Sequence, residues 1–364
     1  MPERYAAITG WGMAVPDRVL SNADLARLVD TTDEWIMSRT GIRERRVVGP
    51  EDSTTSLAVA ASRQALARSG LAASDIDLIV VATCTPDQLL GSEACLVQAE
   101  LGGTAAAFDV GAACSGFVYA LAVGSQFVRG GLHERVLVIG VDTLTRFVDY
   151  TDRSTCILFG DGAGAVVIEA STEPRGLLST VLGADGAGFK HLYIPGWGAS
   201  LPGASGTYPD GGPYIQMNGQ EVFRFAVRVM GDAAAEAVER AGLSFGDIDM
   251  LIPHQANVRI IDAAARRLDL SREKVWVNLD RYGNTSAASI PIAMHEAEAA
   301  GGLKEGHNLV LVAFGGGLSW AAGTVRWGVA GVPRLAGATA VDAGLGMDSD
   351  SKASHGGRLV GVPG

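Results

Sequence analysis

A repeated segment constrains the fold more than any other feature of this sequence. It runs Arg68-Ser-Gly-Leu-Ala-Ala-Ser-Asp-Ile-Asp-Leu-Ile and returns as Arg240-Ala-Gly-Leu-Ser-Phe-Gly-Asp-Ile-Asp-Met-Leu. Each copy has the pattern of a helix end, a glycine cap, a turn and a buried strand. This self-similarity predicts an α/β protein built from two pseudo-repeated halves, residues 1–172 and 173–328. Residues 329–364, rich in Gly, Ala, Ser and Asp without periodicity, predict a flexible tail.

The composition excludes several classes of protein. No apolar run approaches the roughly 18–20 residues that span a bilayer, and the N-terminus lacks a signal-peptide layout, so we expect no membrane partner. The net charge of −11 argues against nucleic-acid binding. The cysteines show neither metal-ligand nor disulfide spacing, which predicts reduced thiols, no metal and a cytoplasmic location. They are Cys84, Cys95, Cys114 and Cys156.

The candidate nucleophile is Cys114. An apolar segment from Phe108 leads into small residues and Cys114, and then apolar residues recur with helical spacing at Phe117, Leu121 and Val128. At such a strand-to-helix junction, the unpaired N–H groups and the positive end of the helix dipole favour a thiolate. The same letters also fit a buried cysteine in a small-residue turn.

Three later segments carry further candidates. His254 follows the repeated strand, which we expect to be central in its sheet, although a structural histidine fits as well. Asn284 lies in Gly-Asn-Thr-Ser-Ala-Ala-Ser, which reads as a helix N-cap but occupies the place in the second half that Cys114 has in the first. Gly316 lies in a glycine run that is either a tight turn or a source of N–H donors.

Together these residues suit one chemistry. A cysteine thiolate attacks an acyl thioester, and the N–H groups of Cys114 and Gly316 would stabilise the tetrahedral oxyanion. A second thioester then becomes a carbanion, and neutral His254 and the Asn284 amide can donate hydrogen bonds to its carbonyl oxygen. Loss of carbon dioxide would generate this carbanion without an acidic residue.

The motifs resemble β-ketoacyl-[acyl carrier protein] synthase III, of the thiolase-like superfamily. The resemblance runs from about residue 4 to 327 and is carried by Ala-Ala-Cys114-Ser-Gly-Phe, Pro-His254-Gln-Ala-Asn and Gly-Asn284-Thr-Ser-Ala-Ala-Ser. It implies a five-layered α/β/α/β/α fold, a homodimer and an acyltransferase without a cofactor. It also implies initiation of type II fatty acid synthesis: an acyl group passes from acyl-CoA to Cys114, and malonyl-[acyl carrier protein] then loses carbon dioxide and condenses to a 3-oxoacyl-[acyl carrier protein].

The resemblance also implies roles for further residues. The coenzyme A site would comprise Trp35, Arg39, Arg153, Met217, Gly219, Phe223 and Asn257. The acyl carrier protein would dock on Arg224, Gln255, Ala256, Asn257, Val258, Arg259, Arg266 and Arg267. A gate to the acyl pocket, contributed across the dimer, would comprise Leu89, Leu90 and Gly91. This gate departs from the aromatic-proline pair of some members, so strict acetyl selectivity is not implied.

Two alternatives stay open at this point. A relative from specialised metabolism, which primes a polyketide or transfers acyl groups, would use the same three residues. A catalytically silent thioester-binding protein belongs to another class. A true thiolase is excluded because it needs a second cysteine, and none follows Cys156.

Overall fold

The computed structural model describes residues 3–196 and 212–328, so the predicted tail at 329–364 lies outside the described residues. These residues form one nine-stranded mixed sheet, in the order β11-β12-β13-β8-β1-β7-β6-β4-β5, and two small sheets, β2-β3 and β9-β10. The strands are β1 (Tyr5–Ala14), β2 (Val19–Ser21), β3 (Glu44–Arg46), β4 (Leu78–Ala82), β5 (Ala106–Val110), β6 (Arg135–Thr143), β7 (Asp161–Ser171), β8 (Gly176–Ala184), β9 (Leu192–Tyr193), β10 (Gln216–Met217), β11 (Met250–Pro253), β12 (Asn308–Gly315) and β13 (Ser319–Arg326).

The large sheet consists of two blocks with the same strand order. The first block is β1-β7-β6-β4-β5, the second is β8-β13-β12-β11, and a single parallel pair, Ala6 with Gly176, joins them. In both blocks the strand after the repeated segment, β4 or β11, runs parallel to its neighbour β6 or β12, and the next strand is antiparallel. The topology thus repeats as the sequence does, while the division at residue 172 stays a prediction.

One expectation about this topology is wrong. We expected the strand before His254 to be central, but β11 ends the strand order, whereas β4 is flanked by β5. The cause is that, in the described part of the chain, the place of β5 in the second block is taken by a short segment that forms only an isolated parallel bridge, Leu251 with Val275, and not a full strand.

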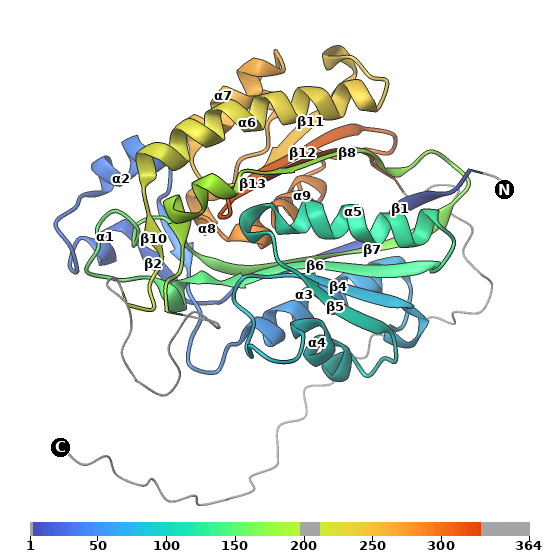
Figure 1. The fold of residues 1–364 in the computed structure, drawn as a ribbon, viewed down its shortest axis with the longest axis horizontal. Helices are drawn as coiled ribbons and strands as arrows, with labels where there is room; N and C mark the ends of the chain where they lie inside the picture. The colour runs from blue at the N-terminus through green and yellow to red at the C-terminus, as the bar shows by residue number, and fades with distance from the viewer. Residues whose placement is uncertain (1–2, 197–211, 329–364) are drawn as a thin grey trace, which may run out of the picture.

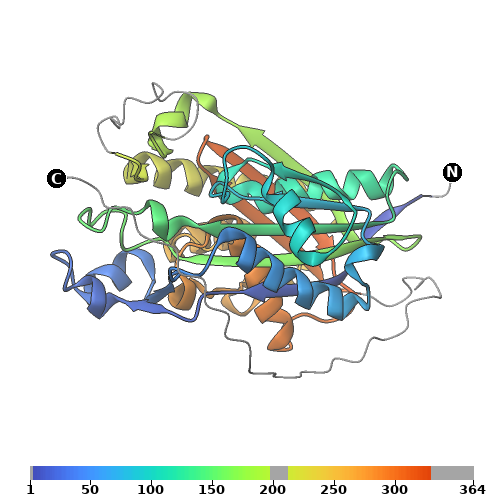
Figure 2. The same cartoon turned by 90° about the horizontal axis from the view of Figure 1, so that it is seen from below.

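Helices cover and separate the two blocks. In Figure 1, α3 and α4 lie under the first block, α5 and α9 lie between the blocks, and α6 and α7 lie over the second, which confirms the predicted five layers. Figure 2 views the molecule from the side of α3 and α4, in blue and teal. The α-helices are α1 (Asn22–Leu25), α2 (Asp33–Thr40), α3 (Thr54–Ser69), α4 (Glu93–Leu101), α5 (Gly116–Arg129), α6 (Gly219–Arg240), α7 (Val258–Arg267), α8 (Leu279–Tyr282) and α9 (Ser289–Ala299).

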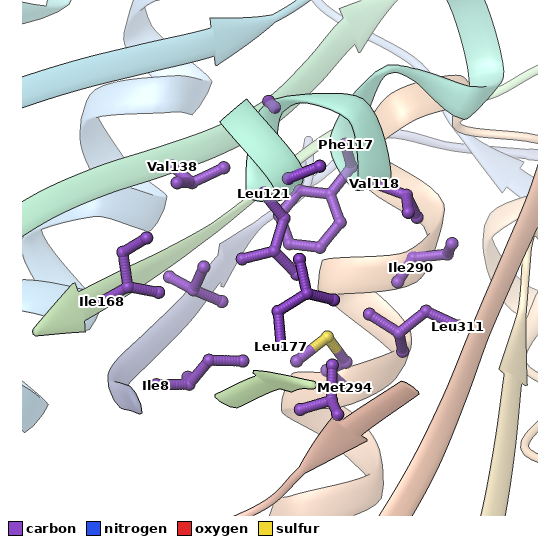
Figure 3. Close-up of a cluster of buried hydrophobic side chains, with 14 of the residues drawn as sticks. Ile8, Phe117, Val118, Leu121, Val138, Ile168, Leu177, Ile290, Met294 and Leu311 are labelled. Atoms are coloured by element: carbon purple, nitrogen blue, oxygen red, sulfur yellow. The ribbon is translucent and has the colours of Figure 1, made fainter. Parts of the chain in front are cut away.

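The first turns of the two helices in the middle layer are buried on nearly all sides because sheet covers them above and below. Phe117 and Leu121 of α5 and Ile290 and Met294 of α9 are fully buried in one core, between side chains of both blocks (Figure 3). The two helices begin side by side: a Cβ on Gly116 would lie 3.6 Å from Cβ of Ala287, just before α9. The segments that carry Cys114 and Asn284 are therefore neighbours.

Two paired glycines allow the segment before α9 to rest directly on the sheet. Gly140 of β6 is paired with Gly164 of β7. A Cβ on Gly140 would lie 2.4 Å from the carbonyl oxygen of Ala287, and one on Gly164 would lie 2.6 Å from Cβ of Pro291. Side chains here would lift the segment that follows Asn284 away from the sheet.

We therefore expect Gly140→Ala to lower the free energy of unfolding by about 1–3 kcal/mol, the usual cost of overpacking a core. The measurement is urea denaturation. Gly186→Ala is the matched control, because a Cβ on Gly186 meets no atom within 4 Å. Equal unfolding midpoints for the two variants would contradict the prediction.

Candidate active site

The three candidate catalytic residues line one cavity. Its volume is about 880 Å³, and Cys114, His254, Asn284 and Phe314 contribute to its wall. A second cavity of about 790 Å³ meets the first at Cys114. The thiol thus lies where two cavities join, and residues far apart in the sequence converge there.

Cys114 lies between β5 and α5, in a short 3-10 helix of residues Ala113–Ser115, and is only 8% exposed. The glycine run packs on its backbone, since a Cβ on Gly315 would lie 2.6 Å from the Cys114 nitrogen. Gly316 lines the second cavity beside Cys114. Its predicted role as an oxyanion donor stays a prediction.

The sequence predicted that Cys114 would favour the thiolate, but its surroundings in the structure favour the thiol. Burial raises the pKa of its thiol to about 12, and the nearby Asp142 carboxylate acts in the same direction, whereas the Ser286 hydroxyl opposes both. Desolvation disfavours the charged form of a buried group. The prediction of a favoured thiolate is therefore wrong for this structure, in which Cys114 is a thiol.

His254 is held from three sides. Its backbone N–H donates to the carbonyl oxygen of Val312 at 2.8 Å, and the Phe314 ring lies edge-on to the imidazole at 5.6 Å and 69°. Nδ1 lies 2.7 Å from Oγ of Ser289, while Nε2 is buried with no partner among the described residues. Burial lowers the pKa of His254 to about 3, so the imidazole is neutral.

The orientation of the Asn284 amide follows from its neighbours. The Asn284 backbone bridges to the segment before β7, donating to the carbonyl oxygen of Leu158 at 2.8 Å and accepting from Gly160 N–H at 3.0 Å. Its Oδ1 accepts from the backbone N–H of Ser286 at 2.9 Å. Because Oδ1 is used, Nδ2 is the atom that this amide can offer to a ligand in the cavity.

The arrangement suits charge that develops on a ligand oxygen. The neutral imidazole of His254 and the carboxamide of Asn284 both line the same cavity, and the described residues that line it include no carboxylate. In a site of low dielectric, such donors stabilise an oxyanion or enolate oxygen strongly. A carboxylate at the same place would oppose that charge.

Most of the residues predicted to bind coenzyme A lie in the wall of the first cavity. Six of them line the first cavity, namely Trp35, Arg39, Met217, Gly219, Phe223 and Asn257, but Arg153 does not. Instead, the Arg153 guanidinium lies 4.9 Å from the centre of the Trp35 ring, which leaves no room for a base between them. The Asn257 amide is already used: Oδ1 accepts from Arg259 N–H and Nδ2 donates to the Arg39 carbonyl oxygen.

The predicted carrier-protein surface needs one correction. Gln255 is only 1% exposed, and its amide contacts backbone atoms of Pro253, Trp276 and Asn278, so it cannot belong to a docking surface. Ala256, Asn257 and Val258 are half-buried at the start of α7. The exposed arginines are Arg224, Arg259, Arg266 and Arg267.

Two of these arginines also have acidic partners on the surface. Arg224 pairs with Glu221 at 2.8 Å, and Arg267 pairs with Asp232 at 3.1 Å.

The predicted gate lies at the second cavity. Leu89 and Leu90 line it and are 71% and 95% exposed, which is unusual for large apolar side chains. Gly91 is exposed, has a left-handed backbone (φ 88°) and does not line the cavity. The closure of this gate across a dimer stays a prediction.

Sequence reasoning missed three residues that shape the site: Ser286 beside the thiol, Ser289 on His254, and the Phe314 ring. The two serines lie within the quoted Gly-Asn284-Thr-Ser-Ala-Ala-Ser motif and Phe314 directly precedes the glycine run, but serines at a helix start and an apolar strand residue give no separate signal. Within residues 3–196 and 212–328 there is no group of His, Cys, Asp and Glu suited to a metal ion. In the same part of the chain, no helix has the length and apolar character needed to cross a membrane.

Comparison with known proteins gives consistent matches. The family model "3-Oxoacyl-[acyl-carrier-protein (ACP)] synthase III" matches residues 108–186, and the model of its C-terminal part matches residues 238–327. A β-ketoacyl-[acyl-carrier-protein] synthase III of Symbiobacterium thermophilum is 54% identical over 90% of this chain and 100% of its own.

Two solved structures are similar over most of the chain. The crystal structure of 3-oxoacyl-[acyl-carrier-protein] synthase III from Aquifex aeolicus has a TM-score of 0.83 and 46% identity, over 88% of this chain and 100% of that chain. The priming β-ketosynthase of the R1128 polyketide pathway has the same TM-score, 0.83, at 37% identity, over 90% of this chain and 98% of its own.

The neutral state of His254 can be tested by an NMR titration. We expect its imidazole signals to stay constant between pH 5 and 8, because burial lowers its pKa to about 3. The control is the same histidine in the urea-denatured chain, which should titrate near pH 6.5. Since the unfolded chain binds this proton and the folded protein does not, His254 should reduce stability as the pH falls below about 6.5. Titration of the His254 imidazole near pH 6.5 in the folded protein would contradict the assignment.

Proposed function

The chain belongs to the 3-oxoacyl-[acyl-carrier-protein] synthase III family, and from that premise we propose that Cys114, His254 and Asn284 carry its reaction. It is an initiating ketosynthase of fatty acid synthesis, an acyltransferase that condenses an acyl primer with a malonyl thioester. The observation that supports the assignment of residues is their convergence on one cavity without a carboxylate.

The first step transfers the acyl group. The Cys114 sulfur attacks the thioester carbonyl of acyl-CoA, forming a carbon–sulfur bond to the enzyme. The N–H groups of Cys114 and Gly316 hold the oxyanion, which collapses as the bond to the coenzyme A sulfur breaks. The thiol proton of Cys114 ends on the coenzyme A thiol, so the step needs no net proton. The helix N-terminus of α5 stabilises the thiolate that forms during this exchange.

The second step makes the carbon–carbon bond. Malonyl-[acyl carrier protein] loses carbon dioxide as its carbon–carbon bond breaks, and the electron pair passes to an enolate. Hydrogen bonds from His254 Nε2–H and Asn284 Nδ2–H to the thioester oxygen stabilise that enolate. Its carbon attacks the acyl group on Cys114, and the thiolate leaves and takes one proton from solvent. The product is a 3-oxoacyl-[acyl carrier protein].

The partners follow from this chemistry. Acyl-CoA enters through the first cavity, where Trp35, Arg39 and Met217 line the wall, and no cofactor takes part in any step. The acidic carrier protein docks on the exposed arginines around the start of α7 by electrostatic steering. We further propose a cytoplasmic homodimer in which the exposed Leu89 and Leu90 meet the partner subunit, since burying two adjacent leucines removes a large apolar area from water.

The alternative in specialised metabolism has less support. A priming ketosynthase of a polyketide pathway shares the fold at 37% identity, whereas a relative named β-ketoacyl-[acyl-carrier-protein] synthase III reaches 54%. A silent thioester-binding protein is disfavoured because the nucleophile and both donors are all present.

The roles of the three residues can be separated by Asn284→Ala. We expect this variant to form the acyl-enzyme normally with acetyl-CoA but to release carbon dioxide from malonyl-[acyl carrier protein] about 10²-fold more slowly. Intact-protein mass spectrometry measures the adduct, and a coupled assay measures carbon dioxide. Cys114→Ala is the control that should form no adduct. Normal carbon dioxide release by Asn284→Ala would remove this residue from the mechanism.

The primer range can be tested with a panel of acyl-CoA donors. The second cavity, of about 790 Å³, is much larger than an acetyl group needs, and each buried methylene contributes about 0.8 kcal/mol. We therefore expect butyryl and isobutyryl groups to load onto Cys114 at least as fast as acetyl, with mass spectrometry of the adduct as the measurement. Loading of acetyl alone would show that the cavity is closed in the assembled enzyme.

A further inference from the structure

The contact between His254 and Ser289 has a consequence for the proton on the imidazole. Both side chains are buried, with 1% and 2% exposure, and Nδ1 lies 2.7 Å from the serine Oγ. A neutral imidazole carries one hydrogen, so one ring nitrogen donates and the other accepts. The partner of Nδ1 therefore decides what Nε2 presents to the cavity.

The hydrogen-bond partners of Ser289 identify which of the two side chains donates. Its hydroxyl has one contact among the described residues, the one to His254. If Nδ1 carried the hydrogen, Oγ would accept it, and the serine hydrogen would be left buried without an acceptor. Such an unsatisfied hydroxyl costs about 1–3 kcal/mol. If the serine donates instead, its hydroxyl and Nδ1 are both satisfied, and the one polar atom of this pair left without a partner is Nε2, which has none in either tautomer.

The position of Ser289 supports the same direction. It is the first residue of α9, an eleven-residue helix, so the positive end of the helix dipole lies beside Nδ1. The positive potential at the helix start disfavours the imidazole hydrogen on Nδ1 and favours an unprotonated Nδ1 there. The Phe314 ring and the backbone bond to Val312 fix where the imidazole lies, but neither contacts Nδ1, so they do not choose its tautomer.

We propose that Ser289 is a positioning residue that donates its hydroxyl hydrogen to Nδ1 of His254 and thereby places the imidazole hydrogen on Nε2, facing the substrate. This inference rests on the proposed function, in which Nε2–H stabilises the enolate oxygen. The opposite tautomer would turn a lone pair toward that oxygen and would repel it. Ser289 thus acts on decarboxylation through His254, without touching the substrate.

The direct test is the tautomer itself. The chain has six histidines, and with ¹⁵N-labelled histidine the protonated and bare ring nitrogens give separate NMR signals. His254→Gln identifies the signals of His254 by their loss. We expect the wild-type enzyme at pH 7 to show a protonated Nε2 and a bare Nδ1. A hydrogen on Nδ1 would overturn the proposal, whatever the variants do.

Variants connect the tautomer with the reaction. In Ser289→Ala we expect a mixture of the two tautomers, carbon dioxide release slowed about tenfold or more, and acyl loading of Cys114 within about twofold of wild type. Ser289→Thr keeps the hydroxyl and should restore both the spectrum and the rate. Ser62→Ala is the matched control, because it removes another fully buried serine hydroxyl, in α3, and should change neither readout.

The possible outcomes separate the two proposals. An unchanged His254 spectrum and an unchanged rate in Ser289→Ala would overturn the role of Ser289. Failure of the proposed function would be seen elsewhere: His254→Ala would release carbon dioxide normally, while the wild-type spectrum still showed the hydrogen on Nε2.

Discussion

The burial of two helices between two blocks of sheet is the constraint on which the site depends. α5 and α9 share one apolar core, and both begin at the same end of it. Because the first turns of both helices are buried between the sheets, their direction and depth are fixed by packing. The chain just before each helix is then held with the same precision. That chain carries Cys114 in one half and Asn284 in the other.

The same burial that orders the site also removes water from it. Desolvation raises the pKa of Cys114 and lowers that of His254, so both side chains are neutral in this structure. In the proposed reaction, charge is therefore stabilised mainly through fixed hydrogen-bond donors, and the described residues that line the first cavity include no carboxylate. Each donor is oriented by a buried neighbour: Ser286 N–H turns the Asn284 amide, and Ser289 is placed to set the imidazole.

Much of the architecture could be predicted from the sequence because it rests on local patterns. The repeated helix–cap–turn–strand segment predicted two similar halves, and α5, with its small residues before Cys114, was predicted from helical spacing. The motifs predicted which residues lie at the site. The apolar pattern of residues before His254 did not reveal that β11 would end the strand order. The position of a strand in a sheet depends on which other segments pair with it, and these are distant in the sequence.

By itself the sequence determined the α/β class, the repeat and the identity of Cys114, His254 and Asn284, since periodicity and motifs are local properties of a chain. Only the tertiary structure decided their environment. It buried Gln255, which the motif had assigned to the surface, and it stacked Arg153 on Trp35. It also brought Ser289 to His254. Burial, pKa and hydrogen-bond direction depend on neighbours that are distant in the sequence, and only the folded chain brings those neighbours together.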